Sequence, residues 1–245
     1  INTSSEKTKV FARKLCKHFN MSPKEYRHTL AKLRAYGNVV ETRMSASNWS
    51  EISYETVPAK ANMRYDKAFE KHDLARRSGY LEKVFLGEDK LNAKGIMPYE
   101  IVHRLTGSGY YGGALKGNLL SELMWKKMVA EGFDNEWGLE DAIVVADGSG
   151  SMYSYASGSS SVMAIEICNA LAIYFAEQLK GVFHNKAITF SESPKFIDLK
   201  DDTSLKDKLE IMFAHDEVAN TNIEAVFDLI LKAAVDNHVQ QSELP

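Results

Sequence analysis

The chain has 245 residues, of which 44% are hydrophobic and 26% are charged. This length exceeds that of one ordinary domain, and the composition is typical of a folded globular protein rather than a disordered one. No apolar run approaches the roughly 20 residues of a membrane-spanning helix, so no membrane association is expected. The two cysteines, Cys16 and Cys168, are far apart and predict no disulfide framework, which favours a cytoplasmic location.

The formal net charge of −3 conceals two parts of opposite sign. Residues up to Gly138 include 23 Lys and Arg against 16 Asp and Glu, whereas the remainder includes 7 against 17. This asymmetry suggests a basic module for an anionic partner beside an acidic module that attracts cations. The alternative is that the two parts pack on each other.

Helix start and stop signals organise the first part. Ser22-Pro23-Lys24-Glu25 combines a capping box with a proline at the first helical position, and it predicts a helix to about Tyr36 that Gly37 ends. Pro58 is expected to open a helix that extends toward Tyr80, and Pro98 a shorter one. A glycine-rich loop over 106–118 and a helix over 119–129 are expected to follow.

From residue 140 the pattern alternates between strands and helices. Apolar runs predict strands over 142–146 and 186–190, and helical periodicity predicts helices over 162–179, 204–213 and 223–235. This order favours an open parallel sheet with helices on both faces, whose ligands bind at the carboxyl ends of the strands. We therefore expect two domains, a helical one over 1–138 and an α/β one over 139–245.

The loop after the first expected strand carries a candidate metal site. Asp147, Ser149 and Ser151 place one carboxylate and two hydroxyls on alternate residues of one turn. Oxygen ligands of low total charge suit Mg²⁺ or Mn²⁺ and leave the ion able to accept an oxygen from a partner. An ordinary turn after a strand is the alternative. The GxGxxG match at residues 107–112 follows a helical pattern and is interpreted as a loop, and no nucleophile with a partner base is evident.

The Asp-x-Ser-x-Ser pattern resembles the metal-ion-dependent adhesion site of the von Willebrand factor A family. The resemblance implies a Rossmann-like α/β fold, incomplete at its C-terminal end, with Thr221 as a further metal ligand. Thr221 with Glu224 would equally form a capping box. The acidic ligand that the family carries on a third loop has no match before Pro245.

The first part carries a second resemblance, to a family related to the Ro autoantigen (TROVE) proteins. It is carried by Trp49, Glu51, Ile52, Tyr54, Val57, Pro58, Lys60, Ala61, Ala68, Phe69, His72, Asp73, Arg76, Tyr80, Leu81, Pro98, Glu100, Ile101 and Val102. It implies HEAT-like helical repeats and binding of structured RNA or single-stranded RNA ends. Lys60, His72 and Arg76 are the motif residues best suited to contact phosphate, unless they bridge neighbouring helices. The face of Lys9, Arg13 and Lys17 could also meet phosphate, or solvent.

These observations together predict a non-catalytic binding protein. In the first hypothesis the helical part binds RNA in a ribonucleoprotein, and the magnesium or manganese site docks a protein that offers an acidic residue. The alternative is a metal-dependent protein assembly module without RNA binding. A metal-dependent hydrolase is the least favoured class, because no general base or second metal site is apparent.

Overall fold

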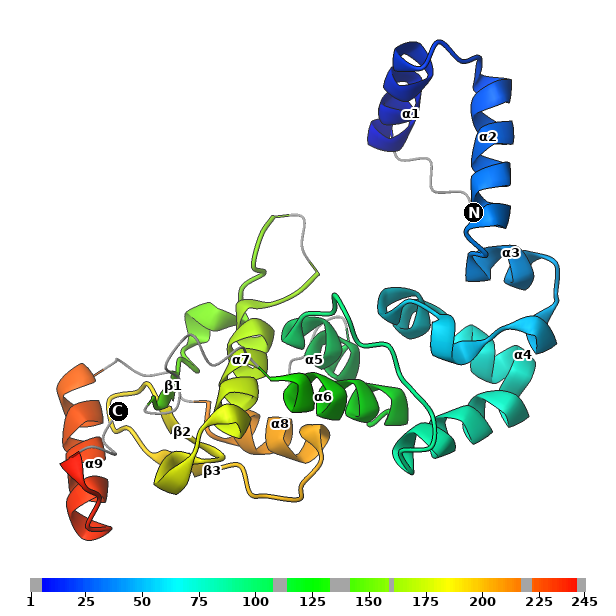
Figure 1. The fold of residues 1–245 in the computed structure, drawn as a ribbon. Coiled ribbons are helices and arrows are strands. Elements are labelled where there is room, and N and C mark those ends of the chain that lie inside the picture. Colours follow the sequence, from blue (N-terminus) through cyan, green and yellow to red (C-terminus); the bar gives the residue numbers. More distant parts are fainter. Residues whose placement is uncertain (1–5, 108–113, 133–141, 159–160, 217–221, 242–245) are drawn as a thin grey trace.

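The computed structural model describes residues 6–107, 114–132, 142–158, 161–216 and 222–241. Helices dominate, and a small sheet lies in the second part (Figure 1). The first part contains α1 (Glu6–His18), α2 (Pro23–Tyr36), α3 (Val40–Ser45), the 3-10 turns η1 (Trp49–Glu51) and η2 (Tyr54–Thr56), α4 (Ala59–Phe85), α5 (Pro98–Thr106) and α6 (Leu119–Glu131). The second contains β1 (Val144–Ala146), η5 (Gly150–Tyr153), α7 (Ala164–Gln178), η6 (Gly181–Phe183), β2 (Lys186–Thr189), β3 (Phe196–Asp198), α8 (Leu205–Ala214) and α9 (Ile223–Asp236).

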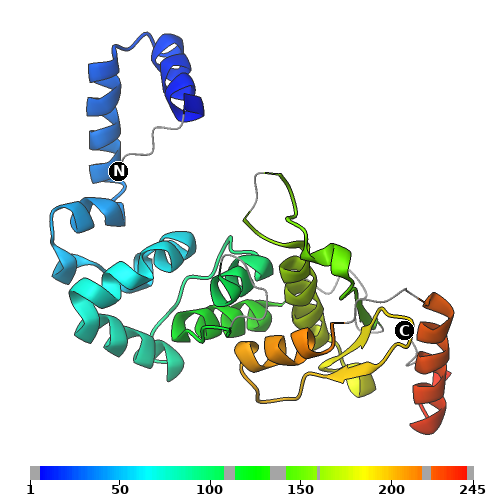
Figure 2. The ribbon, with the colours of Figure 1, turned by 180° about the vertical axis from the view of Figure 1, so that it is seen from behind.

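Helices α1 and α2 form a hairpin that stands away from the rest of the molecule (Figures 1 and 2). The predicted capping box is confirmed, because the Glu25 amide donates to Ser22 Oγ at 3.2 Å and the Ser22 amide donates to Glu25 Oε2 at 2.7 Å. Helix α2 ends at the predicted place, but the residue in the left-handed conformation after it is not the predicted glycine. Gly37 has φ −73°, and Asn38 takes the left-handed conformation with φ 47°. Asparagine adopts this conformation more readily than most residues, so it can replace glycine there.

The sheet has the order β1-β2-β3, with β1 and β2 parallel and β2 and β3 antiparallel. The expectation of a fully parallel sheet was therefore wrong at β3. Only residues 190–195 separate β2 from β3, and a connection this short can join only antiparallel strands, whereas a parallel pair needs a long crossover. The Thr189 amide closes the turn by donating to the Lys195 carbonyl at 3.0 Å.

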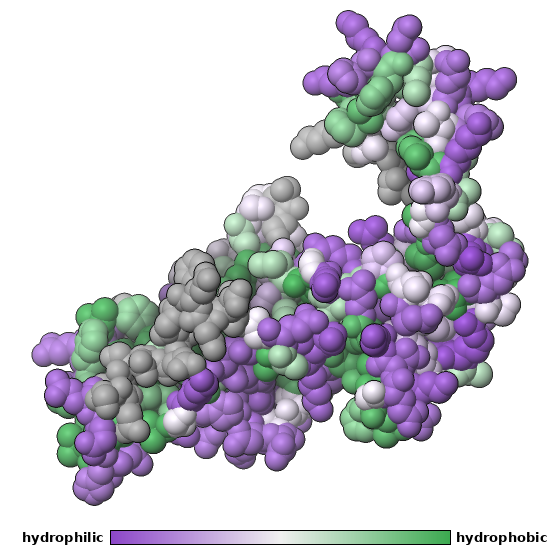
Figure 3. Space-filling model, viewed as in Figure 1, coloured by the Kyte–Doolittle hydropathy of each residue, from purple (hydrophilic) through white to green (hydrophobic). Residues whose placement is uncertain are grey.

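Helix α7 packs on one face of β1, and α9 lies beside the other face across an open groove. Because successive side chains of a strand point to opposite faces, Val144 and Ala146 face the core with α7, while Val145 lines an apolar groove shared with α9. The apolar side of α9 is only partly covered: Ile223, Phe227, Leu231 and Val235 are 60–65% exposed. Hydrophobic surface over α9 is visible in Figure 3.

The two parts pack on each other through α5, α6, α7 and α8. One hydrophobic core runs through both, with Ile101 and Leu105 of α5 and Ile173 of α7 fully buried. Glu122 of α6 accepts from the backbone amides of Leu205 and Lys206 at 2.9 and 3.2 Å, and so caps the start of α8. The oppositely charged parts are therefore joined by a packed interface. No helix among the described residues is long and apolar enough to cross a bilayer.

Candidate metal centre

The Asp147 loop begins where β1 ends. The Ser149 amide donates to Asp147 Oδ1 at 2.9 Å, which bends the chain sharply after the strand. Ser149 Oγ lies 3.0 Å from Ser151 Oγ. Asp147 and Ser149 are half-buried and Ser151 is exposed, so the cluster opens to solvent on the Ser151 side. The structure thus brings three of the predicted ligand residues onto one turn. Thr221, the fourth, lies outside the described residues.

A second carboxylate, which the sequence analysis did not identify, lies against this loop. Asp216 follows α8, and a Cβ atom added to Gly148 would lie 2.8 Å from Asp216 Oδ1 and 3.1 Å from its Cα. No side chain fits there, so glycine at position 148 allows the carboxylate to approach the backbone beside Asp147. The Tyr153 hydroxyl donates to Asp216 Oδ2. Asp147, Gly148, Tyr153 and Asp216 therefore form one polar cluster at the carboxyl end of β1.

The cluster combines two carboxylates with partial burial, and its electrostatics follow from both. Burial raises the pKa of Asp216 from 3.8 to about 6, while the Tyr153 hydrogen bond and His215 act in the opposite direction. Burial also raises the pKa of the half-buried Cys168 thiol, and the negative charges of Asp147 and Asp216 both add to that increase. Both carboxylates therefore act on the same thiol of α7. A bound cation would stabilise the ionised carboxylate and so lower the pKa of Asp216.

The raised pKa of Asp216 predicts a pH-dependent stability. Because the folded state holds this proton more tightly than the unfolded state, the contribution of Asp216 is favourable below pH 3.8 and is lost as the pH rises toward about 6. With chelator present, we expect Asp216→Asn to be more stable than the wild type at about pH 8, by ~1 kcal/mol after allowing for partial solvent screening. Urea unfolding across pH measures this difference.

The matched control for this prediction is Asp228→Asn, which removes an exposed acid of α9. It should change stability little at any pH. A loss of stability at about pH 8 in Asp216→Asn, or a gain that persists unchanged at about pH 4, would contradict the prediction.

A small cavity borders the cluster behind Gly148 and Asp216. Asn169, Thr189, Ser191 and His215 contribute to its wall. Asn169 is 1% exposed, and its Nδ2 atom has no hydrogen-bond partner among the residues that the structure describes. Leaving such a buried donor unpaired costs about 1–3 kcal/mol, so the cavity offers a polar position for a water or another acceptor next to Asp216.

The donor set fits a hard divalent cation. Two carboxylates and two hydroxyls are oxygen ligands of the kind that Mg²⁺ and Mn²⁺ accept, and Mg²⁺ usually retains several waters, so the protein need not fill its coordination sphere. Among the described residues, no group of three or more His, Cys, Asp or Glu side chains is placed to hold a metal ion. Any metal at this loop would therefore depend on the serine hydroxyls as well as on Asp147 and Asp216.

The residues predicted to contact RNA make contacts within the protein. Lys60 forms an ion pair with Glu100 of α5 at 3.0 Å. His72 stacks on Trp49 with ring centroids 4.4 Å apart, and Arg76 donates to the carbonyls of Trp49 and Ile52 at 2.8 and 2.7 Å. A break in α4 at Asp73, with φ −148° and ψ 42°, separates His72 from Arg76. These contacts are those of the structural alternative, and RNA binding by the three residues stays a prediction.

The basic face of α1 is solvated. Lys9 and Arg13 each lie 3.8 Å from Glu6, and the three side chains are 49–72% exposed. Pairs of this kind contribute little to stability.

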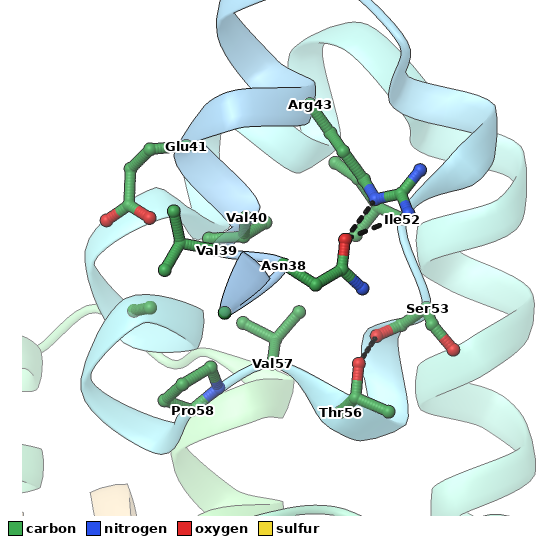
Figure 4. A pocket seen from close by; sticks show the side chains of 12 residues that line it. Asn38, Val39, Val40, Glu41, Arg43, Ile52, Ser53, Thr56, Val57 and Pro58 are labelled. Atoms are coloured by element: carbon green, nitrogen blue, oxygen red, sulfur yellow. Dashed lines mark hydrogen bonds between the residues drawn. The ribbon is translucent and has the colours of Figure 1, made fainter. Parts of the chain in front are cut away.

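A cavity of about 400 Å³ lies between α3, the two 3-10 turns and the start of α4 (Figure 4). Its walls include the apolar side chains of Val39, Val40 and Val57. Arg43 donates to Asn38 Oδ1 and pairs with Glu51, so its charge is already matched. Figure 4 shows the three valines, Asn38 and Arg43 around the opening. The cavity offers space but no uncompensated charge from Arg43, and it does not include Lys60, His72 or Arg76.

Comparisons with known proteins identify two family models. The model described as "Domain of unknown function (DUF2828)" matches residues 4–135, and the model described as "Domain of unknown function (DUF7788)" matches residues 141–244. "Uncharacterized protein L728" of Acanthamoeba polyphaga mimivirus is 27% identical over 237 residues. That alignment covers 91% of this chain and 39% of the viral protein, so the chain spans well under half of that relative's length. No solved structure matches.

These matches correct both family resemblances. The family models that match are neither the Ro (TROVE) family nor the von Willebrand factor A family, so the assignment to a Ro-related protein with an A domain was wrong. The helical motif has a packing explanation instead. His72 stacks on Trp49, and Arg76 donates to the backbone carbonyls of Trp49 and Ile52, so these contacts hold the 3-10 turns against α4.

Proposed function

Because the chain belongs to the DUF2828 family, whose description names no activity, we propose from its geometry that it docks a carboxylate-bearing protein partner through a divalent metal ion that has no catalytic role. The observation that carries this proposal is the contact of the Asp147 loop with Asp216. One turn presents a carboxylate and two adjoining hydroxyls, and a second carboxylate with a raised pKa lies against the same backbone.

The residues of the loop and Asp216 would each have a separate role in holding the metal ion. Asp147 and Asp216 supply the negative charge, and Ser149 and Ser151 supply neutral oxygens. The Ser149 amide fixes the orientation of Asp147, and the Tyr153 hydroxyl fixes that of Asp216. Mg²⁺ or Mn²⁺, when bound, would supply open coordination positions for an outside oxygen. Since Ser151 is exposed, a partner's Asp or Glu side chain could approach from that side.

Docking rather than hydrolysis is favoured by the residues around the loop. His215, the nearest imidazole in sequence to the site, directs Nδ1 to the Ile211 carbonyl at 2.8 Å. Burial keeps the Cys168 thiol protonated by raising its pKa, and a protonated thiol is a poor nucleophile. The thiol is therefore not set to react at the proposed metal, and His215 Nδ1 is held by the backbone of α8.

The proposal predicts that a divalent metal stabilises the fold through Asp147. For a dissociation constant of about 1 mM, about 10 mM MgCl₂ adds ~1.4 kcal/mol and raises Tm by about 3–5 °C. We expect Asp147→Asn to lose this increase, because the amide cannot replace the charge of the carboxylate. Thermal unfolding with Mg²⁺, with Ca²⁺ and with chelator measures the effect.

The control is again Asp228→Asn, which should retain the full increase. Equal stabilisation of the wild type and Asp147→Asn by Mg²⁺ would show that the metal binds elsewhere, and the proposed function would then fail.

A further inference from the structure

A serine, a histidine and a buried glutamate meet at the junction of the two parts of the molecule. Ser161 Oγ lies 3.3 Å from His103 Nε2, and His103 Nδ1 lies 3.0 Å from Glu166 Oε1. His103 belongs to α5 and Glu166 to the first turn of α7, 63 residues apart. No local motif could have shown this arrangement, because only the packing of α5 on α7 creates it.

The surroundings fix the carboxylate firmly. The Glu166 side chain is 2% exposed, and it accepts hydrogen bonds from the Met163 amide at 2.7 Å and from the Thr106 hydroxyl. An ionised carboxylate only accepts hydrogen bonds, so the Nδ1 atom of a neutral His103 carries the ring proton and donates it to Glu166. Nε2 is then the acceptor, and it faces the Ser161 hydroxyl. This is the tautomer that a general base requires.

The three residues differ in solvent exposure, and a reactive site needs an accessible nucleophile and a shielded orienting group. Ser161 is exposed, the His103 side chain is 25% exposed, and Glu166 is buried. The nucleophile can therefore meet a substrate while the residue that orients the base is shielded from water. The serine–histidine separation is slightly longer than the roughly 2.6–3.2 Å of a tight pair, as is common before substrate binds. A purely structural ion pair between α5 and α7 would explain His103 and Glu166 but not the position of Ser161.

We propose that Ser161, His103 and Glu166 form a nucleophile, base and orienting group that accept an acyl group from an activated ester or thioester. The Ser161 oxygen forms a bond to the acyl carbon while its proton passes to His103 Nε2. The bond from the acyl carbon to the leaving group breaks, and the leaving group takes that proton. Water then gives a proton to His103 and bonds to the acyl carbon, which releases the carboxylic acid and returns the proton to Ser161.

The substrate class follows from the position of the site. An exposed serine cannot exclude water, so the acyl group is expected to end on water. Of the cavities described above, none includes Ser161 or His103. Substrates with good leaving groups are therefore favoured over amides, which need strong enclosure and electrostatic stabilisation. This activity is independent of the proposed metal-dependent docking.

The test uses the full chain, a fluorophosphonate probe and p-nitrophenyl acetate. We expect the probe to label Ser161, as mapped by mass spectrometry, and the protein to hydrolyse the ester above the rate in buffer. Ser161→Ala should abolish both. His103→Gln should lower the hydrolysis rate by about 100-fold or more, since a positioned general base contributes about 10²–10⁴. Ser157→Ala, which alters an exposed serine of the same loop, should change neither.

Three results would overturn the proposal: no labelling of Ser161 in the wild type, labelling of Ser157 and Ser161 at equal rates, or wild-type hydrolysis by Ser161→Ala. Because Ser161 is exposed, its replacement by alanine is not expected to prevent folding, and circular dichroism confirms this for each variant. Chelator should leave the labelling rate unchanged, so a failure of the triad and a failure of the metal site give different results.

Discussion

Replacing Asp66 with alanine should destabilise the protein by about 3–5 kcal/mol, because it leaves a buried cation without its counterion. Asp66 and Arg77 are both 1% exposed in their side chains, and Asp66 Oδ1 accepts from Arg77 Nη2 at 2.6 Å. The other oxygen accepts from Arg104 and from Asn118 Nδ2. One carboxylate therefore joins both halves of the broken helix α4 to α5 and to the start of α6.

Urea unfolding measures this loss, with Glu70→Ala as the matched control, since Glu70 is an exposed acid on the same helix. The control should change stability by less than about 0.5 kcal/mol. A double variant adds a sharper test. Arg77 lies over the rings of Tyr54 and Phe69, at 5.1 and 5.3 Å, so methionine can occupy its apolar surroundings. Asp66→Ala with Arg77→Met should recover part of the loss, and a larger loss than in Asp66→Ala would contradict the charge argument.

Glu177→Ala should lower the free energy of unfolding by about 3 kcal/mol, because it also leaves a buried cation without its counterion, here at the interface of the two parts. Glu177 Oε1 accepts from Lys208 Nζ at 2.6 Å, and its Oε2 accepts from Trp125 Nε1 at 3.0 Å. The Lys208 side chain is 6% exposed, and within the described part of the chain its remaining hydrogen-bond partner after removal of Glu177 is Asn185 Oδ1, at 3.3 Å. The substitution therefore leaves the Lys208 ammonium group and the Trp125 indole N–H without their carboxylate acceptor between α6, α7 and α8.

The control for Glu177 is Glu131→Ala, which removes an ion pair of similar length, 3.2 Å to Lys127, between side chains about 45% exposed. This surface pair should be worth less than about 1 kcal/mol. Adding Lys208→Met to Glu177→Ala should restore part of the stability, because no buried charge remains. Equal losses for Glu177→Ala and Glu131→Ala would show that burial does not determine the effect.

Helices were the most predictable part of the fold, because their signals are local. Ser22 with Glu25, and Pro98 at a helix start, fix helix ends through groups three or four residues away. Strand β1 is also three residues long, but it ends the five-residue apolar run 142–146. Strand β3 (Phe196–Asp198) was missed because only two of its residues are apolar, and its antiparallel direction depends on the turn before it. Local reasoning can place an element, but it cannot place the partner of a three-residue strand.

The residues of the candidate sites were likewise predictable where they are close in sequence, and not where packing brings them together. Asp147, Ser149 and Ser151 are neighbours in sequence, and their clustering was predictable from one loop. Asp216 was not, because it reaches Gly148 only through the packing of α8 on α7, which places the end of α8 against the loop after β1. The contact of Ser161 with His103 likewise depends on α5 packing on α7. Short motifs also misled, since the aromatic and basic positions around Trp49 suggested a family that the comparisons do not support.

Direct titration with Mn²⁺, followed by the electron paramagnetic resonance signal of the free ion, tests the metal centre most directly. Mn²⁺ prefers the same oxygen ligands as Mg²⁺, and its signal disappears on binding. We expect one ion per wild-type chain, displaced by excess Mg²⁺, with binding lost in Asp147→Asn and retained in Asp228→Asn. Binding of the same strength by the wild type and Asp147→Asn, or no binding by the wild type, would contradict a metal site on the Asp147 loop.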